Sequence, residues 1–288
     1  MRNKTCLPSR ERLRNTSLLF LLFLAMPGRV QAQNRPFPYA LGVRDLVMVP
    51  VGLGMSFWGQ SLVDGYDLIA RDEISRLTPS DVNWFDRSAT RNWSLEWDDR
   101  SDGYRDMVVR AALLLLGAET TYSLLGERFT EPLTLATMFA ETYLFTAGIT
   151  YTTKGLTGRK RPYVYNAALS VDERYAIATS DGNEVFFSFY SGHAAAAFAA
   201  ATFTSKVFAD IHGTSAWSYL VWGSTLSVAT VTAYARVKAG VHYPSDAIVG
   251  ALAGSAIGYL VPALHKRSSG DRLSLLVTPA HWGLQLRF

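Results

Sequence analysis

Residues 193–210, HAAAAFAAATFTSKVFAD, give the clearest indication of the fold of this chain. Small apolar side chains fill the run without the strict alternation of a strand, which predicts a helix that packs closely against its neighbours. Gly250, Gly254 and Gly258 likewise place small residues along one face of another predicted helix. An ordinary alanine-rich helix of a soluble protein would have the same composition, and the sequence leaves both interpretations open.

Six apolar segments of similar length are separated by polar stretches: 46–63, 107–125, 133–152, 193–210, 216–235 and 246–263. Of the polar loops between them, residues 64–106 hold eleven acidic and six basic side chains, and residues 163–190 form a second loop. The sequence shows no repeat of 20–50 residues, which argues against a solenoid. We predict an all-α protein, a six-helix bundle. Glu119 and Glu141 fall in mid-segment and argue against membrane spans at 107–125 and 133–152, because a carboxylate at bilayer depth is costly.

The N-terminus is typical of a secretory signal peptide over residues 1–32. A basic stretch ends at Arg14, the apolar run SLLFLLFLAM follows at 17–26, and Val30-Gln31-Ala32 offers small residues for cleavage. An uncleaved anchor helix is the alternative, although the run is short for a span. Cys6, the sole cysteine of the 288 residues, lies in this segment, so cleavage would remove every thiol and exclude disulfides.

Composition limits the class of partner. The chain is 49% hydrophobic and 18% charged, which excludes a disordered chain. Residues 1–32 hold six of the 28 basic residues and one of the 24 acidic ones, so the remainder carries no basic excess. We therefore expect no nucleic-acid partner.

We predict four parts in the chain: the signal at 1–32, a first helix and polar loop at 33–106, a catalytic helical core at 107–267 and a β-like tail at 268–288. In the tail, Trp282, Leu284, Leu286 and Phe288 alternate with polar or small residues, a period-two strand pattern. One or two such strands are too few for a membrane barrel. A short strand, or a hairpin with Leu273–Val277, is the expectation.

Three polar clusters stand at the ends of predicted helices. They read KGLTGRKRP at 154–162, YSGH at 190–193, and ARVKAGVHYPSD at 235–246. In an up-and-down bundle these three positions share one end, so we expect the clusters to converge. Three cations and two imidazoles at one bundle end suit an anionic ligand.

The residue types in these clusters fit phosphate chemistry. Lys154, Arg161 and Arg236 supply positive charge, and guanidinium forks match phosphate oxygens. Ser191 suits the N-cap of its helix, which would point the backbone amides of Gly192 and His193 at an anion.

Two histidines can share the proton transfers of such a reaction. His242 and Asp246 lie four residues apart across a helix start, with Pro244 suited to the first helical position. Asp246 is placed to hold one imidazole nitrogen, which leaves the other free to attack, and His193 is a second proton carrier. Each residue alone is more often a cap or a solvated side chain. The coincidence of the three clusters is what predicts a phosphate site.

Together the clusters resemble the motifs of the type 2 phosphatidic acid phosphatase (PAP2) superfamily, to which bacterial class A acid phosphatases and vanadium haloperoxidases are related. Its motifs are K-x6-R-P, P-S-G-H and S-R-x5-H-x3-D, and they match this chain in order between residues 154 and 246. Tyr190 stands in place of the proline and Ala235 in place of the serine. Neither departure removes a charge or a proton carrier. The helical resemblance covers residues 107–263.

The resemblance implies a role for each matched residue. His242 would be the nucleophile that forms a phosphohistidine, Asp246 would orient it, and His193 would protonate the leaving alkoxide. The residues implied to hold the phosphoryl oxygens are Lys154, Arg161, Ser191, Gly192 and Arg236. These phosphatases require no metal or other cofactor, and we expect none; His212, His265 and His281 are isolated in the sequence and receive no role.

The resemblance implies hydrolysis of a lipid phosphate monoester or an isoprenyl diphosphate in a bacterial cell envelope, with membrane association. Residues 240–246, GVHYPSD, are similar to the lipid-acting branch. The alternative is a soluble periplasmic acid phosphatase that acts on small phosphate esters, which the signal and the modest mean hydropathy favour. A vanadate-dependent haloperoxidase usually needs a longer chain, and intact histidines oppose an inactive helical membrane or interaction protein. If all six helices spanned, the motif end would face the cytoplasm, whereas such enzymes usually face outward.

Overall fold

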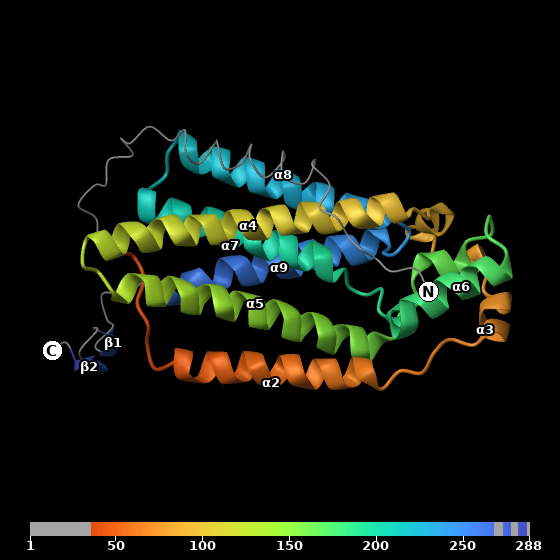
Figure 1. Ribbon diagram of the computed structural model, residues 1–288, viewed down its shortest axis with the longest axis horizontal. Coiled ribbons are helices and arrows are strands. Elements are labelled where there is room, and N and C mark those ends of the chain that lie inside the picture. Colours follow the sequence, from red (N-terminus) through yellow and green to blue (C-terminus); the bar gives the residue numbers. More distant parts are fainter. Residues whose placement is uncertain (1–35, 268–272, 278–281, 287–288) are drawn as a thin grey trace, which may run out of the picture. The chain divides into compact units, whose positions relative to one another are not determined.

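The computed structural model describes residues 36–267, 273–277 and 282–286. The predicted signal segment and His281 lie outside these residues. Six long helices run side by side, and each contains most or all of one predicted apolar segment (Figure 1). Their bounds are α2 (Asp45–Asp64), α4 (Leu95–Leu125), α5 (Thr130–Thr157), α7 (Gly192–His212), α8 (Ala216–Lys238) and α9 (Pro244–His265).

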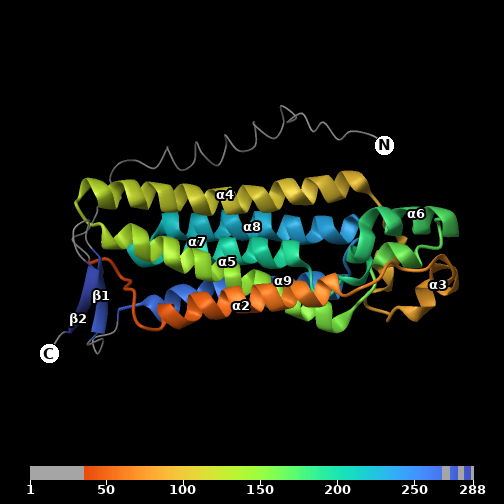
Figure 2. The ribbon, with the colours of Figure 1, turned by 60° about the horizontal axis from the view of Figure 1, so that its bottom comes forward.

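The remaining elements are short. Two further α-helices, α3 (Arg71–Arg76) and α6 (Val171–Asp181), pack together at one end of the bundle, where Figures 1 and 2 both place them. Four 3-10 turns belong to the polar connections: Pro79–Asp81, Arg87–Arg91, Pro162–Tyr165 and Gly182–Phe186. The backbone of β1 (Leu273–Val277) pairs antiparallel with that of β2 (Trp282–Leu286), with Leu273 opposite Leu286.

The predicted architecture is wrong in its six helices. The chain is all-α, but its described residues form eight α-helices. The two extra helices, α3 and α6, are short and polar, so neither contains the long apolar run from which the six helices were predicted. α6 nevertheless has a readable start, because Ser170 and Glu173 form a capping box in which each side chain accepts from the other's backbone N–H.

The polar loop predicted at 64–106 is also shorter than expected. α4 begins at Leu95, where the hydroxyl of Ser94 accepts a hydrogen bond from the backbone N–H of Trp97. Its first three turns are charged rather than apolar, so the hydropathy pattern placed them in the loop. This polar extension carries α4 to the same end of the bundle as the three motif clusters.

The glycine stripe of α9 lies directly against α7. A Cβ atom on Gly250, Gly254 or Gly258 would fall 2.5, 2.1 or 2.3 Å from a backbone oxygen of α7 or of its N-cap residue. The predicted close packing of small residues is therefore confirmed at this contact. α7 is also the most enclosed of the four helices that are apolar enough to span a membrane: 72% of its apolar window is buried, against 17–33% for α2, α4 and α9.

Large apolar side chains cover the outside of the long helices. Examples exposed to more than 60% are Leu46 and Phe57 on α2, Leu125 on α4, Tyr219 on α8 and Leu252 on α9. Such a surface is typical of a protein embedded in lipid or covered by a partner. Together with the four candidate spans, it indicates association with a membrane.

The two mid-segment carboxylates that argued against spanning both face histidines. The carboxylate of Glu119 lies 2.7 Å from Nε2 of His212, and that of Glu141 lies 3.4 Å from Nε2 of His265. Both glutamates are buried. Ionisable residues inside membrane-spanning helices usually face the bundle interior, as these two glutamates do, so their presence does not exclude spanning.

Candidate active site

Six of the eight predicted site residues line one cavity of about 620 Å³ at the polar end of the bundle. They are Lys154, Arg161, Gly192, His193, Arg236 and His242. The helices bring them together because α5 and α8 end at this face while α7 and α9 begin there. Ser191 and Asp246 lie beside the cavity in contact with one another, since the backbone N–H of Ser191 donates to the backbone oxygen of Asp246 at 3.1 Å.

His242 is held by a backbone carbonyl. Its Nδ1 lies 2.7 Å from the oxygen of Ser188, to which it donates, and the side chain is 1% exposed. This hydrogen bond fixes the tautomer and leaves Nε2 with a free lone pair. Burial lowers the pKa of His242 well below 6.5, and the charges of Arg236, Arg161 and Lys154 lower it further. The neutral form of the ring is therefore favoured beside three cations.

Asp246 lies beside His242 without accepting from it. Its Oδ2 is 3.7 Å from Nδ1 of His242 and instead accepts from the hydroxyl of Ser188 and the backbone N–H of Tyr243, at 2.5 and 2.9 Å. The expected direct hydrogen bond is thus replaced by an indirect arrangement. Asp246 holds Ser188, and the carbonyl of Ser188 holds the imidazole.

Arg159 and Asp86 complete this support. The guanidinium of Arg159 donates to Oδ1 of Asp246 at 2.5 Å and to Asp86 at 2.7 Å, and it stacks 4.0 Å from the ring centroid of Tyr243. Asp86 is 2% exposed and also accepts from Ser245. These contacts fix the start of α9, which positions the loop that carries His242.

His193 has partners on α4. Its Nε2 lies 2.6 Å from Oδ1 of Asp102 and 2.6 Å from an amino nitrogen of Arg105. Nε2 can either donate to Asp102 or accept from Arg105, and both contacts hold the ring beside the cavity. A histidine that lines the cavity in this position is a candidate proton carrier.

The cations of the site are paired with carboxylates. Arg161 donates to Asp181 at 2.9 Å and to Glu184 at 2.6 Å, and Glu184 lies 3.9 Å from Nζ of Lys154. The adjacent carboxylates raise the pKa of Arg161 despite its burial. Arg236 donates to Asp98 and, at 3.1 Å, to the hydroxyl of Ser101.

Ser191 is the N-cap of α7, as predicted, and its Oγ accepts from the backbone N–H of Ala194 at 3.4 Å. Gly192 follows at the wall of the cavity, where a Cβ would lie 3.3 Å from Thr150 and 3.9 Å from Nζ of Lys154. Absence of a side chain therefore keeps the start of α7 open to a bound group. α9 begins at Pro244, also as predicted.

Sequence reasoning missed three site residues on α4, namely Asp98, Asp102 and Arg105. They follow one another at i, i+4 and i+7, which places them on one helix face. That spacing was available in the sequence, but the high charge of the segment concealed it. No sequence pattern pointed to Arg159, Asp86 or Glu184, because they reach the site only when the chain folds.

The cavity continues away from the charged end between α4, α5 and α7. Its deeper wall is mostly apolar and is formed by Val109, Phe139, Tyr143, Ala147, Ala196, Ala199 and Ala200. Phe139 and Lys154 are fifteen residues apart on α5, so the cavity follows the helix for about 22 Å.

His265, predicted to be isolated, is instead buried against two acidic residues. Its Nε2 is 2.9 Å from Oδ1 of Asp45 and 3.4 Å from Oε2 of Glu141. None of the three lines the cavity described above. The prediction failed because the three residues are far apart in the sequence and meet only in the bundle.

A comparison with protein families finds a match in the central and C-terminal part of the chain. Residues 134–269 match the model of the PAP2 superfamily, and this range contains all three motif clusters. No curated protein and no solved structure matches the chain significantly. Members of this superfamily are phosphatases that act on phosphate esters. Residues 134–269, which are 136 of the 288 residues of the chain, are therefore similar to the PAP2 superfamily.

Proposed function

We propose that this protein is a metal-independent phosphatase that hydrolyses lipid phosphate monoesters or isoprenyl diphosphates through a phosphohistidine intermediate. The phosphate group binds at the charged end of the cavity, where Lys154, Arg161 and Arg236 supply the positive charge. The backbone amides of Gly192 and His193 at the start of α7 add donors aligned with the helix dipole. This set provides the charge stabilisation that a metal would otherwise supply.

The shape of the cavity is the observation that carries the lipid assignment. The cavity follows α5 for about 22 Å from the phosphate end, and the lining of its deeper part, between α4, α5 and α7, is mostly apolar. A hydrocarbon chain attached to the bound phosphate would lie along this wall and bury apolar surface. A small water-soluble ester would leave most of it unused.

In the first step, Nε2 of His242 attacks phosphorus and the bond between phosphorus and the leaving oxygen breaks. His242 enters this step neutral because its pKa is lowered, and its Nδ1–H stays bonded to the carbonyl of Ser188. His193 transfers a proton to the leaving alkoxide, while Asp102 and Arg105 hold its ring beside the cavity.

In the second step, water attacks the phosphohistidine. His193, now neutral, takes a proton from that water, and the bond from phosphorus to Nε2 of His242 breaks. The products are inorganic phosphate and the free enzyme with both histidines restored. The three cations hold the phosphoryl oxygens throughout, which stabilises the pentacoordinate transition states of both steps.

The outer surface supports a place in a membrane. Exposed apolar side chains on the long helices and four candidate spans favour an embedded bundle over the soluble periplasmic phosphatase that acts on small esters. We place the protein in the bacterial cell envelope, with the cavity mouth at one membrane surface. Export by the segment at 1–32 accords with this location.

A substrate panel tests the lipid assignment. Purified protein is assayed with long-chain phosphatidic acid, a short-chain analogue and p-nitrophenyl phosphate, and Ala147→Leu is compared with Ala256→Leu. Ala147 lines the apolar wall, whereas Ala256 is exposed on α9. Ala147→Leu should lower kcat/KM at least tenfold for the long-chain lipid and leave p-nitrophenyl phosphate within twofold. Equal effects on all three substrates would reject the lipid-chain cavity.

The nucleophile is tested separately. His242→Ala should abolish phosphate release while helicity and expression stay near normal. Vanadate, which mimics the pentacoordinate transition state, should inhibit the wild type at low concentration. Turnover by His242→Ala, or indifference of the wild type to vanadate, would overturn the phosphohistidine mechanism whatever the substrate.

A further inference from the structure

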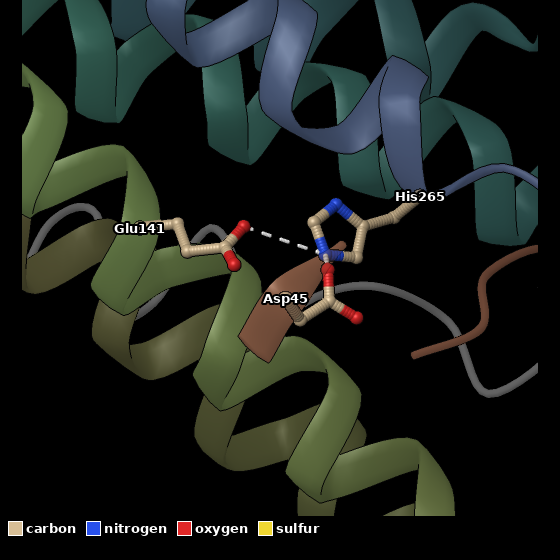
Figure 3. Close-up of side chains that lie close together, drawn as sticks. All are labelled: Asp45, Glu141 and His265. Atoms are coloured by element: carbon tan, nitrogen blue, oxygen red, sulfur yellow. Dashed lines mark ion pairs between the residues drawn. The ribbon is translucent and has the colours of Figure 1, made fainter. Parts of the chain in front are cut away.

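A second cluster of chemically competent side chains is buried away from the phosphatase cavity. Asp45 begins α2, Glu141 lies in the middle of α5, and His265 ends α9. One ligand atom from each residue lies within 4.8 Å of the other two. Figure 3 shows the carboxylate of Glu141 directed from α5 towards the ring of His265, with Asp45 beside the same ring nitrogen.

We propose that this cluster binds a single divalent transition-metal ion, with Zn²⁺ as the best fit, which joins α2, α5 and α9. One imidazole nitrogen and two carboxylate oxygens suit zinc, whereas Mg²⁺ and Ca²⁺ prefer all-oxygen sites. Water would supply the fourth ligand. The ion has a structural role, because none of its ligands lines the cavity that holds His242.

The burial of Glu141 is the first argument for an ion. The residue is 0% exposed, and neither of its carboxylate oxygens has a hydrogen-bond partner among the described residues. A buried carboxylate without partners is costly, and a bound cation removes that cost. The nearby guanidinium of Arg44 forms an ion pair with Asp45 at 3.5 Å, and the described residues show no ion pair between Arg44 and Glu141.

The second argument is the orientation of the ligands. Nδ1 of His265 donates to the backbone oxygen of Val261 at 2.8 Å, which leaves Nε2 as the free lone pair that faces both carboxylates. Metal-binding histidines are usually oriented by such a bond from the other ring nitrogen. Oδ2 of Asp45 is likewise occupied by the backbone N–H of Gly42 at 2.6 Å, which leaves Oδ1 for the ion.

The spacing of the ligand atoms is the third argument. Zinc bonds to nitrogen and oxygen of about 2.0–2.1 Å place tetrahedral ligand atoms about 3.3 Å apart. Nε2 of His265 lies 2.9 Å from Oδ1 of Asp45 and 3.4 Å from Oε2 of Glu141, which brackets this value. Nε2 of His265 and Oδ1 of Asp45 lie close together, but neither atom has a hydrogen-bond partner among the described residues. Their contact therefore does not have the geometry of a hydrogen bond.

Metal content tests the proposal. Full-length protein purified in detergent, treated with chelator, reloaded with ZnCl₂ and desalted should retain about one zinc per chain. Glu141→Gln and His265→Gln should each retain less than a tenth of that amount. His212→Gln is the matched control, because His212 pairs with a single carboxylate, Glu119, and should keep the wild-type content. Equal zinc in wild type and Glu141→Gln, or none in wild type, would overturn the proposal.

A measurement on the unaltered chain covers the case in which the variants do not fold. Loading the chelated wild type with Co²⁺ should produce the visible absorption bands of a four-coordinate ion, and ZnCl₂ should displace them. Absence of these bands would mean that the cluster is a buried histidine–carboxylate ion pair without metal. His242→Ala should bind Co²⁺ as the wild type does, so loss of phosphatase activity and loss of the metal remain separate results.

Discussion

Nδ1 of His242 donates to the backbone carbonyl of Ser188 at 2.7 Å, while the carboxylate of Asp246 lies 3.7 Å from the same nitrogen. The imidazole is thus positioned by a main-chain oxygen, and Asp246 acts on it through Ser188. A residue that acts through another should be less critical to catalysis than the nucleophile itself.

We therefore expect Asp246→Asn to lower kcat by about 10- to 150-fold, because loss of a hydrogen bond to a charged group costs about 1.5–3 kcal/mol. His242→Ala should remove turnover entirely. Steady-state kinetics on one substrate compare the two variants, and circular dichroism checks that both are folded. Complete inactivity of folded Asp246→Asn would mean that the carboxylate contacts the reacting ring directly during turnover.

Burial and the nearby cations both lower the pKa of His242. Burial and the charges of Arg236, Arg161 and Lys154 lower its pKa, so the neutral nucleophile persists as the pH falls below 6.5. The acidic limb of kcat/KM should lie well below pH 6.5. Arg236→Gln removes a positive charge and should move this limb to higher pH, besides lowering kcat/KM at every pH. A limb that stays in place, or moves to lower pH, would contradict this electrostatic coupling.

Glu184 competes with phosphate for the site cations. Its carboxylate lines the cavity, accepts from Arg161 at 2.6 Å and lies 3.9 Å from Lys154. Glu184→Gln should tighten vanadate inhibition about three- to tenfold, equivalent to about 0.7–1.4 kcal/mol. Asp172→Asn, which breaks an exposed pair with Arg71, is the control and should not change the inhibition constant. Weaker inhibition of Glu184→Gln would instead assign the carboxylate to holding Arg161 in place.

The contact between α7 and α9 tolerates no added side chain. A Cβ on Gly254 would lie 2.1 Å from the backbone oxygen of Ala195, so Gly254→Ala must separate the helices and should cost about 1–3 kcal/mol. Gly223→Ala on α8 has open space and should be neutral or slightly stabilising. Thermal unfolding in detergent measures both. A Tm for Gly254→Ala equal to that of the control would show that the helices separate without cost.

The features that could be predicted from the sequence are those that depend on neighbouring residues in the chain. Apolar runs located the six long helices, and cap residues such as Ser191 and Pro244 fixed two of their starts. Up-and-down connectivity then placed the motif clusters at one end. The three site residues at the start of α4 share a helix face, but hydropathy alone classed them with the loop.

Contacts that depend on packing could not be predicted. The cluster of Asp45, Glu141 and His265 joins three helices across more than 200 residues, and no spacing pattern links them. The carbonyl of Ser188 took the hydrogen bond expected for Asp246 because the loop before α7 crosses the start of α9. Main-chain partners of this kind have no side-chain signature in a sequence.

The glycine contact between α7 and α9 has a consequence for how the enzyme meets different substrates. His193 is the second residue of α7 and His242 lies two residues before α9, so one closely packed pair of helices holds both imidazole rings. Adjustment of the cavity to bulkier or slimmer bound groups then falls on α4 and α5, which form the rest of its wall. The placement of the two imidazoles and the shape of the cavity can consequently diverge independently among descendants of this chain.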